Sequence, residues 1–188
     1  MYKVNEIFYS LQGEGFHTGR AAVFVRFAGC NLRCTFCDTD FSHFELLTAE
    51  QIAERVFAYS TNPYVLIVLT GGEPSLQVDQ ALVDTLHRHD QVIAIETNGT
   101  HQIPDNIDWV TVSPKADSTV VLTNANEVKV VLTNQSENKL QHWMETIDAT
   151  YYFLQPCSCS NTDAVVAYIK SHPEWRLSLQ THKYIHIQ

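Results

Sequence analysis

The chain has 188 residues, of which 45% are hydrophobic and 18% charged, and its formal net charge is −9. This length and composition are typical of one globular domain that buries a core without disulfides. Twelve scattered Lys and Arg residues argue against a nucleic-acid partner, because such binding depends on clustered basic side chains. No membrane-length apolar run or signal core is present, so we expect a cytoplasmic protein without a membrane partner.

Short apolar runs bounded by turn residues predict buried strands, with helix-like segments between most of them. The predicted strands cover residues 21–28, 65–70, 92–97, 109–113, 127–132, 151–155 and 176–180. The predicted helices cover residues 48–59, 76–89, 135–147 and 161–171. Thr48 and Gln51 have the spacing of a capping box, and Asn161 is a candidate N-cap. No repeat or interior linker divides residues 1–188, which we interpret as a single domain.

The alternation of strands and helices predicts an α/β fold with parallel strands and right-handed crossovers. A complete βα barrel takes about 250 residues. A shorter chain therefore favours a partial barrel of about six strands, open on one side. The polar motifs GCNLRCTFCDTD, TGGEP, ETNG, SPK, LQP and QTHK each follow a predicted strand. Because the carboxyl ends of barrel strands share one face, we expect these motifs to converge on one site.

Three cysteines follow the first predicted strand with the spacing C-x₃-C-x₂-C: Cys30, Cys34 and Cys37. Thiolates at this spacing can bind three irons of a [4Fe–4S] cluster and leave the fourth iron open. A closed zinc site is the alternative, but it needs a fourth Cys or His nearby, and the nearest His is His43. Whether Cys157 or Cys159 supplies another ligand is left open.

Other residue types in these motifs suggest ligand contacts. The paired glycines Gly71 and Gly72 allow a backbone edge to approach a ligand closely, and Glu73 suits an ammonium group. Arg26 alternates with apolar neighbours, so we expect its side chain inside the barrel, where it would bind a carboxylate or form an internal salt bridge. Asp38, Thr39 and Asp40 offer the hard oxygen ligands that Mg²⁺ prefers, or cap a turn.

The cysteine spacing, TGGEP and the later polar strand ends resemble the radical S-adenosylmethionine (radical SAM) superfamily. The resemblance implies a [4Fe–4S] cluster whose open iron is chelated by S-adenosylmethionine, with the cofactor's ammonium held by the GGE segment. It implies further cofactor contacts at the polar strand ends, each of which is alternatively a loop residue that satisfies nearby backbone. These residues are Glu96, Asn98, Ser113, Lys115 and Gln155.

A narrower resemblance rests on FYSLQGEGFHTGR, AVFVRFAGCNLRCTFCDTDF, TGGEP, AIETNG, VSPK, LQP and WRLSLQTHKYIHI, in this order. These stretches resemble the radical SAM enzymes that convert 6-carboxy-5,6,7,8-tetrahydropterin to 7-carboxy-7-deazaguanine and release ammonia, in queuosine and other 7-deazapurine biosynthesis. The resemblance implies a homodimer, an external electron donor such as flavodoxin, and Mg²⁺ bound by Thr39. The implied substrate-binding residues are Gln12, Glu14, Arg26, Thr70, His182 and Gln188.

The last residues are expected to reach this site. The alternating apolar side chains Tyr184, Ile185 and Ile187 are expected to anchor the segment, although chain ends often fray. The resemblance implies that Gln188 binds substrate through its backbone carboxylate, so its side-chain identity should matter little. We expect His87, His89 and His142 to lie on helix surfaces and to have no chemical role.

Two alternatives of other kinds are left open. A glycyl-radical enzyme activase also has a compact radical SAM domain, but it needs a protein-docking surface and has no use for LQGEG. A small iron–sulfur electron carrier, or a zinc-stabilised binding module, would be non-enzymatic. Such a carrier normally keeps four protein ligands on its cluster and needs no GGE loop.

Overall fold

The computed structural model describes residues 1–37, 39–40, 42–116 and 118–188. Nine strands form one sheet in the order β3-β1-β2-β4-β5-β6-β7-β8-β9. The strands are β1 (Tyr2–Leu11), β2 (Ala21–Phe27), β3 (Glu45–Leu47), β4 (Leu66–Gly71), β5 (Ile93–Thr97), β6 (Trp109–Val112), β7 (Asn124–Leu132), β8 (Asp148–Pro156) and β9 (Trp175–Leu177). The α-helices are α1 (Ala49–Tyr59), α2 (Gln80–Leu86), α3 (Glu137–Thr146), α4 (Thr162–Ser171) and α5 (Thr181–Tyr184). Short 3₁₀ turns are η1 (Pro74–Leu76), η2 (His87–His89) and η3 (Cys157–Cys159).

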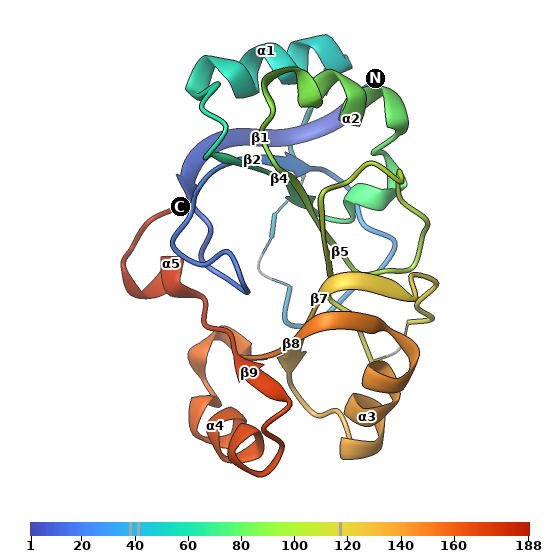
Figure 1. Cartoon of the computed structure of the whole chain (residues 1–188), viewed down its shortest axis with the longest axis vertical. Helices are drawn as coiled ribbons and strands as arrows, with labels where there is room; N and C mark the ends of the chain where they lie inside the picture. The colour runs from blue at the N-terminus through green and yellow to red at the C-terminus, as the bar shows by residue number, and fades with distance from the viewer. Residues whose placement is uncertain (38, 41, 117) are drawn as a thin grey trace.

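The sheet forms a partial barrel, because in the described parts of the chain its edge strands β3 and β9 do not pair with each other. From β2 through β4 to β9 all neighbouring strands are parallel, whereas β1 pairs antiparallel with both β2 and β3. The predicted open α/β barrel is therefore confirmed. Figure 1 shows the β1–β2–β4 half and the β7–β8–β9 half curving around a common interior, with the C-terminal segment returning to the end of β1.

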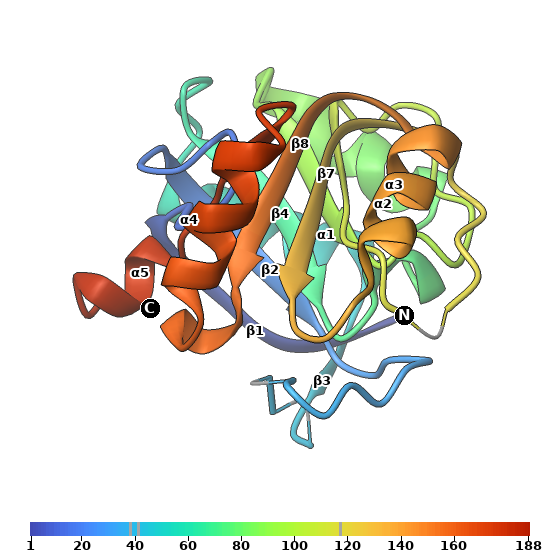
Figure 2. The ribbon, with the colours of Figure 1, turned by 90° about the horizontal axis from the view of Figure 1, so that it is seen from below.

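The helices cover the outer face of the sheet because their apolar stripes match the outward side chains of the strands. Ile52 and Val56 of α1 pack with Val25 of β2 in one buried cluster. Trp143 of α3 and Val165 of α4 pack with strands β7 and β8 in a second. Figure 2 shows α3 and α4 against the β7–β8 half, with α1 behind the β2–β4 half.

The inner face changes from apolar to polar along the strands. Its small apolar cluster consists of the buried residues Ala22, Leu66, Val68 and Ala94. Two residues further along their strands lie Thr70 and Glu96, and Arg26 pairs with Thr70 in register. Because strand side chains alternate between faces, the inward positions near the carboxyl ends carry polar groups, and this gradient positions the site.

Several local predictions were wrong or incomplete. Strand β1 was not predicted, because its burial is interrupted and its register shifts between Val4 and Glu6. The helix predicted over 76–89 is divided into η1, α2 and η2, since Asp79 caps α2 by accepting from Leu82 N at 3.0 Å. Thr48 and Gln51 form the predicted capping box. Asn161 occupies the N-cap position, but its side chain bonds Cys157 N and Leu132 O instead.

The last residues are held by polar contacts, contrary to the expectation of apolar anchoring. Tyr184 and Ile185 are each 51% exposed. Thr181 N donates to Gly13 O at 2.9 Å, and Ser10 Oγ donates to Gln188 O at 2.7 Å. Within the described residues, none of the helices combines the length and apolar character needed to cross a membrane.

Replacing Ile52 with Ala should destabilise the protein by about 2–5 kcal/mol, because a fully buried aliphatic side chain between α1 and the sheet leaves a cavity. Urea unfolding measures the difference. The matched control is Val166→Ala on α4, where the side chain is 37% exposed and the change should stay within about 0.5 kcal/mol. Equal losses in the two variants would contradict the described packing.

Candidate active site

Two adjoining cavities open at the carboxyl ends of the parallel strands. The arginine cavity, about 380 Å³, is lined by Arg26, Phe8, Phe24 and residues of β1, the β1–β2 loop and the C-terminal segment. The cysteine cavity, about 630 Å³, is lined by the cysteine loop and by the ends of strands β4 to β8. Six residues line both cavities and form what we call the shared wall: Glu14, Thr39, Thr70, Gly71, Glu96 and Gln180.

The cysteine loop follows β2 and presents all three predicted thiols to the cysteine cavity. Cys30 and Cys34 are partly buried and Cys37 is exposed. In the described part of the chain, no three His, Cys, Asp or Glu side chains form a ready site for a single metal ion. A four-iron cluster is larger than one ion, and thiolates are its usual protein ligands. The donor set therefore fits a cluster bound through three cysteines of one loop.

The paired glycines after β4 bring the backbone of this segment against the cysteine loop. A Cβ at Gly71 would collide with the Phe27 backbone, and one at Gly72 would collide with Gly29 O. Gly71 also has φ +123°, a conformation that side-chain-bearing residues rarely adopt. Gly72 N donates to Phe27 O and Glu73 N donates to Gly29 O, both at 2.9 Å. Only glycine allows this approach.

The Glu73 carboxylate is buried and organises the surrounding loops. It accepts hydrogen bonds from Thr97 Oγ1 at 2.6 Å, Asn98 N at 2.7 Å and Ser75 N at 3.0 Å. Asn98 Nδ2 in turn donates to Asn31 Oδ1 in the cysteine loop at 3.0 Å. A carboxylate offers about four acceptor positions, and donors within the described residues take three of them here.

The other predicted cofactor residues line the same cavity. Lys115 Nζ donates to Ser113 Oγ at 2.8 Å, and burial lowers the pKa of the Lys115 ammonium. Gln155 Oε1 accepts from Ser178 Oγ at 2.8 Å, and that hydroxyl accepts from Gly15 N at 3.0 Å. Cys157 also lines this cavity.

Arg26 points into the arginine cavity and also forms the internal salt bridge that was its alternative. Its Nε donates to Glu6 Oε1 at 2.7 Å, and its guanidinium lies 5.5 Å from the ring centroid of Phe8. Gln188 Nε2 donates to the second Glu6 oxygen at 2.7 Å. The Gln188 side chain therefore has a specific contact, although the sequence suggested that its identity would matter little. The two terminal guanidinium nitrogens of Arg26 are the ones a planar carboxylate would meet.

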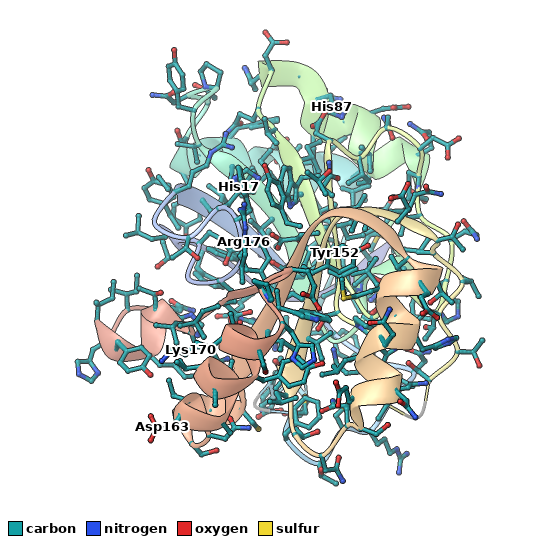
Figure 3. All side chains as sticks on the ribbon, turned by 60° about the horizontal axis from the view of Figure 1, so that its bottom comes forward. His17, His87, Tyr152, Asp163, Lys170 and Arg176 are labelled. Carbon is teal, nitrogen blue, oxygen red and sulfur yellow. The ribbon has the colours of Figure 1, made fainter. Side chains whose placement is uncertain are left out.

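The β1–β2 loop enters the barrel and is anchored there by aromatic stacking. The Phe16 ring stacks on Trp109 at 4.9 Å and on Tyr151 at 4.7 Å between centroids. His17 packs edge-on against Trp109, and the Arg176 guanidinium lies 4.8 Å from the Tyr151 centroid. Figure 3 shows His17 and Arg176 in this region. This anchor fixes the loop that carries Gln12 and Glu14.

The substrate residues predicted from opposite ends of the chain meet in the arginine cavity. Gln12, Glu14, Arg26, Thr70, His182 and Gln188 all line it. A Cβ on Gly13 would collide with the His182 ring, so α5 lies directly on the β1–β2 loop. Thr39 lies in the shared wall, whereas Asp38 is outside the described residues.

Sequence reasoning missed the ion pairs behind the shared wall. Lys129 of β7 is 4% exposed, and its Nζ lies 2.8 Å from Glu14 Oε2 and 2.7 Å from Glu96 Oε2. Gln12 Nε2 donates to Glu96 Oε1 at 3.1 Å, and Gln180 Nε2 donates to Glu14 Oε1 at 3.0 Å. A signal was present, since EVKVVL alternates charged and apolar residues as the Arg26 strand does.

The two carboxylates respond differently to their surroundings. Burial by itself would raise the pKa of Glu14, but the Lys129 ammonium lowers it to about 2. Burial raises the pKa of Glu96 to about 7 against the opposing effect of Lys129, with Glu127 and Glu14 adding to the rise. Lys129 itself keeps its proton, because the surrounding carboxylates outweigh the burial that disfavours its charge and hold its pKa above the ordinary value.

Comparisons with known proteins identify the family of the chain. The Radical SAM superfamily model matches residues 24–148. A curated protein of Bacteroides thetaiotaomicron named 7-carboxy-7-deazaguanine synthase is 52% identical over 188 residues and covers 100% of both chains. One of the same name from Caulobacter vibrioides is 45% identical and covers 98% of each. The crystal structure of QueE from Escherichia coli superposes with a TM-score of 0.80 at 29% identity, covering 96% of this chain and 94% of that one.

The raised pKa of Glu96 predicts a specific dependence of stability on pH. Between its reference pKa of 4.5 and its folded value of about 7, the folded state binds more protons than the unfolded state. The free energy of unfolding should therefore fall as the pH rises through this window, by about 1–3 kcal/mol. Glu96→Gln should remove this slope, as measured by urea unfolding before any cofactor is added.

The control for this prediction is Glu54→Gln, which changes an exposed carboxylate on α1. This variant should keep the wild-type slope. Identical slopes in the wild type and Glu96→Gln would show that Glu96 titrates as in the unfolded chain, and would refute the described burial.

Proposed function

Because the chain belongs to the radical SAM superfamily, and within it to the 7-carboxy-7-deazaguanine synthases, we propose that it converts 6-carboxy-5,6,7,8-tetrahydropterin to 7-carboxy-7-deazaguanine and ammonia. Product and ammonia together contain all the atoms of the substrate, so the net reaction consumes no oxidant. This reaction contributes to the biosynthesis of queuosine and related 7-deazapurines.

One observation of the structure carries the proposal. The three thiols line one cavity, Arg26 lines the other, and both cavities share the wall of six residues. A radical generated at a cluster-bound cofactor reacts only with an atom held next to it. A carboxylate-bearing substrate in the arginine cavity would lie next to such a cofactor in the cysteine cavity.

The residues of the cysteine cavity fit a [4Fe–4S] cluster with S-adenosylmethionine on its open iron. When bound, this pair would supply radical chemistry able to abstract a hydrogen atom from the pterin. Cys30, Cys34 and Cys37 hold the cluster. The backbone at Gly71 and Gly72, with Glu73, accepts the cofactor's ammonium. The remaining polar groups orient the cofactor: Glu96, Asn98, Ser113, Lys115 and Gln155.

The arginine cavity provides groups that match each part of a carboxypterin. The Arg26 guanidinium binds the substrate carboxylate, held in place by its bond to Glu6. Gln12 and Glu14 bind the donors and acceptors along the pterin edge, while Thr70, His182 and Gln188 complete the site. The β1–β2 loop and α5 also exclude water, which protects a radical from side reactions.

Thr39 is the proposed protein ligand for Mg²⁺. It lies in the shared wall, close to the space that the substrate carboxylate would occupy. Mg²⁺ often takes only one or two protein ligands and fills its remaining positions with substrate oxygens and water. One protein hydroxyl is therefore sufficient when the substrate carboxylate and water fill the remaining positions.

The wider setting follows from the same family membership. We propose that the protein forms a homodimer. Tyr9 and Tyr59 stack on each other and are both exposed, so they offer an apolar surface for contact between subunits. An external electron donor such as flavodoxin reduces the cluster. The thiols must stay free to bind iron, which favours a reducing compartment and hence the cytoplasm.

The alternatives are less favoured. A glycyl-radical activase or an electron carrier would not require the arginine cavity. The curated relatives described above share the synthase name over the full length of this chain. A zinc-binding module is likewise disfavoured by membership of the radical SAM superfamily.

The decisive experiment is anaerobic reconstitution with iron and sulfide, followed by S-adenosylmethionine, reductant, Mg²⁺ and the carboxytetrahydropterin. The wild type should form 7-carboxy-7-deazaguanine. Cys30→Ala, Cys34→Ala and Cys37→Ala should each lose both product and the visible absorption of the cluster, because each removes one of three ligands. Cys157→Ala is the control for cluster ligation and should retain the visible absorption of the cluster.

The outcomes separate different errors. A fully loaded cluster that cleaves S-adenosylmethionine without forming the product would refute the substrate assignment. A loaded cluster that fails to cleave the cofactor would refute the radical chemistry as well. Loss of the cluster in Cys157→Ala would show that the ligand set is not limited to the three loop cysteines.

The position of His182 against Gly13 predicts a substrate-binding role that a nearby histidine should not share. His182→Asn should raise KM for the pterin about tenfold, the effect of losing one or two polar contacts, with a smaller change in kcat. His186→Asn changes an exposed histidine with φ +55°, which Asn tolerates, and should leave KM unchanged. Similar kinetics in the two variants would exclude His182 from the substrate site.

A further inference from the structure

Lys129 is a buried cation with no role in the function proposed above. It lies on β7, points to the inner face and lines the cysteine cavity behind the shared wall. Its ammonium lies 2.8 Å from Glu14 and 2.7 Å from Glu96. These carboxylates come from the β1–β2 loop and from β5, so one ammonium joins three separate parts of the chain.

The arrangement is specific rather than a general accumulation of charge. Each carboxylate has a second polar partner, Gln180 for Glu14 and Gln12 for Glu96. Gln12 Oε1 also accepts from the backbone N–H of Glu14 at 3.2 Å, so Gln12 joins the main chain at Glu14 to the Glu96 carboxylate. The side chains of the wall are therefore held in one fixed pattern of donors and acceptors.

Among the described residues, Lys129 is the lysine whose ammonium contacts both of these carboxylates. Glu127 on β7 is engaged separately, by Phe16 N at 2.8 Å and by Thr111 Oγ1 at 2.9 Å. Lys115, after β6, bonds Ser113, while His182 on α5 faces Glu14 from the other cavity. Without Lys129, the carboxylates of Glu14, Glu96 and Glu127 would share a buried space with no ammonium in contact.

We infer that Lys129 is a positioning residue for substrate and cofactor together, because its single ammonium fixes both carboxylates of the wall between them. The inference rests on the proposed function, in which Glu14 binds the pterin and Glu96 binds S-adenosylmethionine. Breaking one member of a buried ion-pair network leaves an uncompensated charge, which either takes up a proton or moves. Either response disturbs both ligand sites at once.

A second consequence concerns pH. Lys129 opposes protonation of Glu14 and of Glu96. Loss of Lys129 therefore raises the pKa of both carboxylates. Binding of the pterin should then weaken as the pH falls toward 6, because a protonated Glu14 presents a hydroxyl where the ligand needs an acceptor. A purely structural role for Lys129 would weaken binding equally at every pH.

The test uses Lys129→Met, Lys129→Arg and the control Lys170→Met, which changes an exposed lysine on α4 (Figure 3). The first probe is 6-carboxypterin, the unreactive oxidised analogue, whose fluorescence reports binding without cluster or turnover. The second is S-adenosylmethionine, measured by equilibrium dialysis on the reconstituted enzyme. Thermal unfolding of each variant reports whether it is folded.

Lys129→Met should bind both probes about tenfold more weakly or worse, and its affinity for 6-carboxypterin should fall further between about pH 8 and about pH 6. Lys129→Arg keeps the charge and should restore the pH dependence of the wild type. Lys170→Met should match the wild type. Weakening of one probe alone, or an unchanged pH profile in Lys129→Met, would overturn the inference.

Two further comparisons keep the result decisive. If Lys129→Met does not fold, the double variant Glu96→Gln/Lys129→Met takes its place, because it removes one buried charge of each sign. Its reference is Glu96→Gln alone. Equal binding of 6-carboxypterin by these two variants would overturn the inference. If the wild type binds the analogue but forms no deazaguanine, the proposed reaction is refuted while the inference about Lys129 stands. A wild type that fails to bind the analogue refutes both.

Discussion

The parallel pairing of β2 with β4 sets the geometry of the whole site. Arg26 lies opposite Thr70, and Phe27 lies opposite Gly71. The pairing continues past the strand ends through the backbone bonds from Gly72 to Phe27 and from Glu73 to Gly29. The cysteine loop and the glycine segment are thus joined by main-chain hydrogen bonds. Side chains at Gly71 and Gly72 would separate the two loops, so the backbone itself frames the cysteine cavity.

The barrel pairs its buried charges and covers its open side with two segments of the chain. Behind the wall, buried ions are paired, and each carboxylate has additional hydrogen bonds, as the cost of isolated buried charge requires. At the open side, the β1–β2 loop is anchored by aromatic stacking while the C-terminal segment lies over it. A partial barrel lacks the strands that would close it, and these two segments cover the gap. The same segments carry most of the proposed substrate contacts.

Much of the site could be predicted because its chemistry is local in sequence. The cysteines, the paired glycines and the strand-end polar residues lie in short motifs, and parallel strands bring such motifs to one face. The alternation in EVKVVL could have indicated an inward Lys129, but its ion pairs were missed because the partners Glu14 and Glu96 lie far away in the sequence. Strand β1 was missed because antiparallel pairing does not need the continuous apolar run of a buried parallel strand. The apolar residues after His182 were wrongly expected to be buried, because burial depends on tertiary contacts that a local sequence pattern does not reveal.

The contact between Ser10 and Gln188 spans 178 residues, and it has a consequence for how the protein opens. The cysteine cavity rests on central strands with buried neighbours, whereas the arginine cavity is completed by a short helix with exposed apolar residues. Segments with few buried contacts open at lower free energy than the core, in cooperative units of their own. Partial unfolding should therefore open the arginine cavity while the cysteine cavity stays intact. Amide hydrogens of the last residues would exchange early, and thermal inactivation would precede loss of the fold.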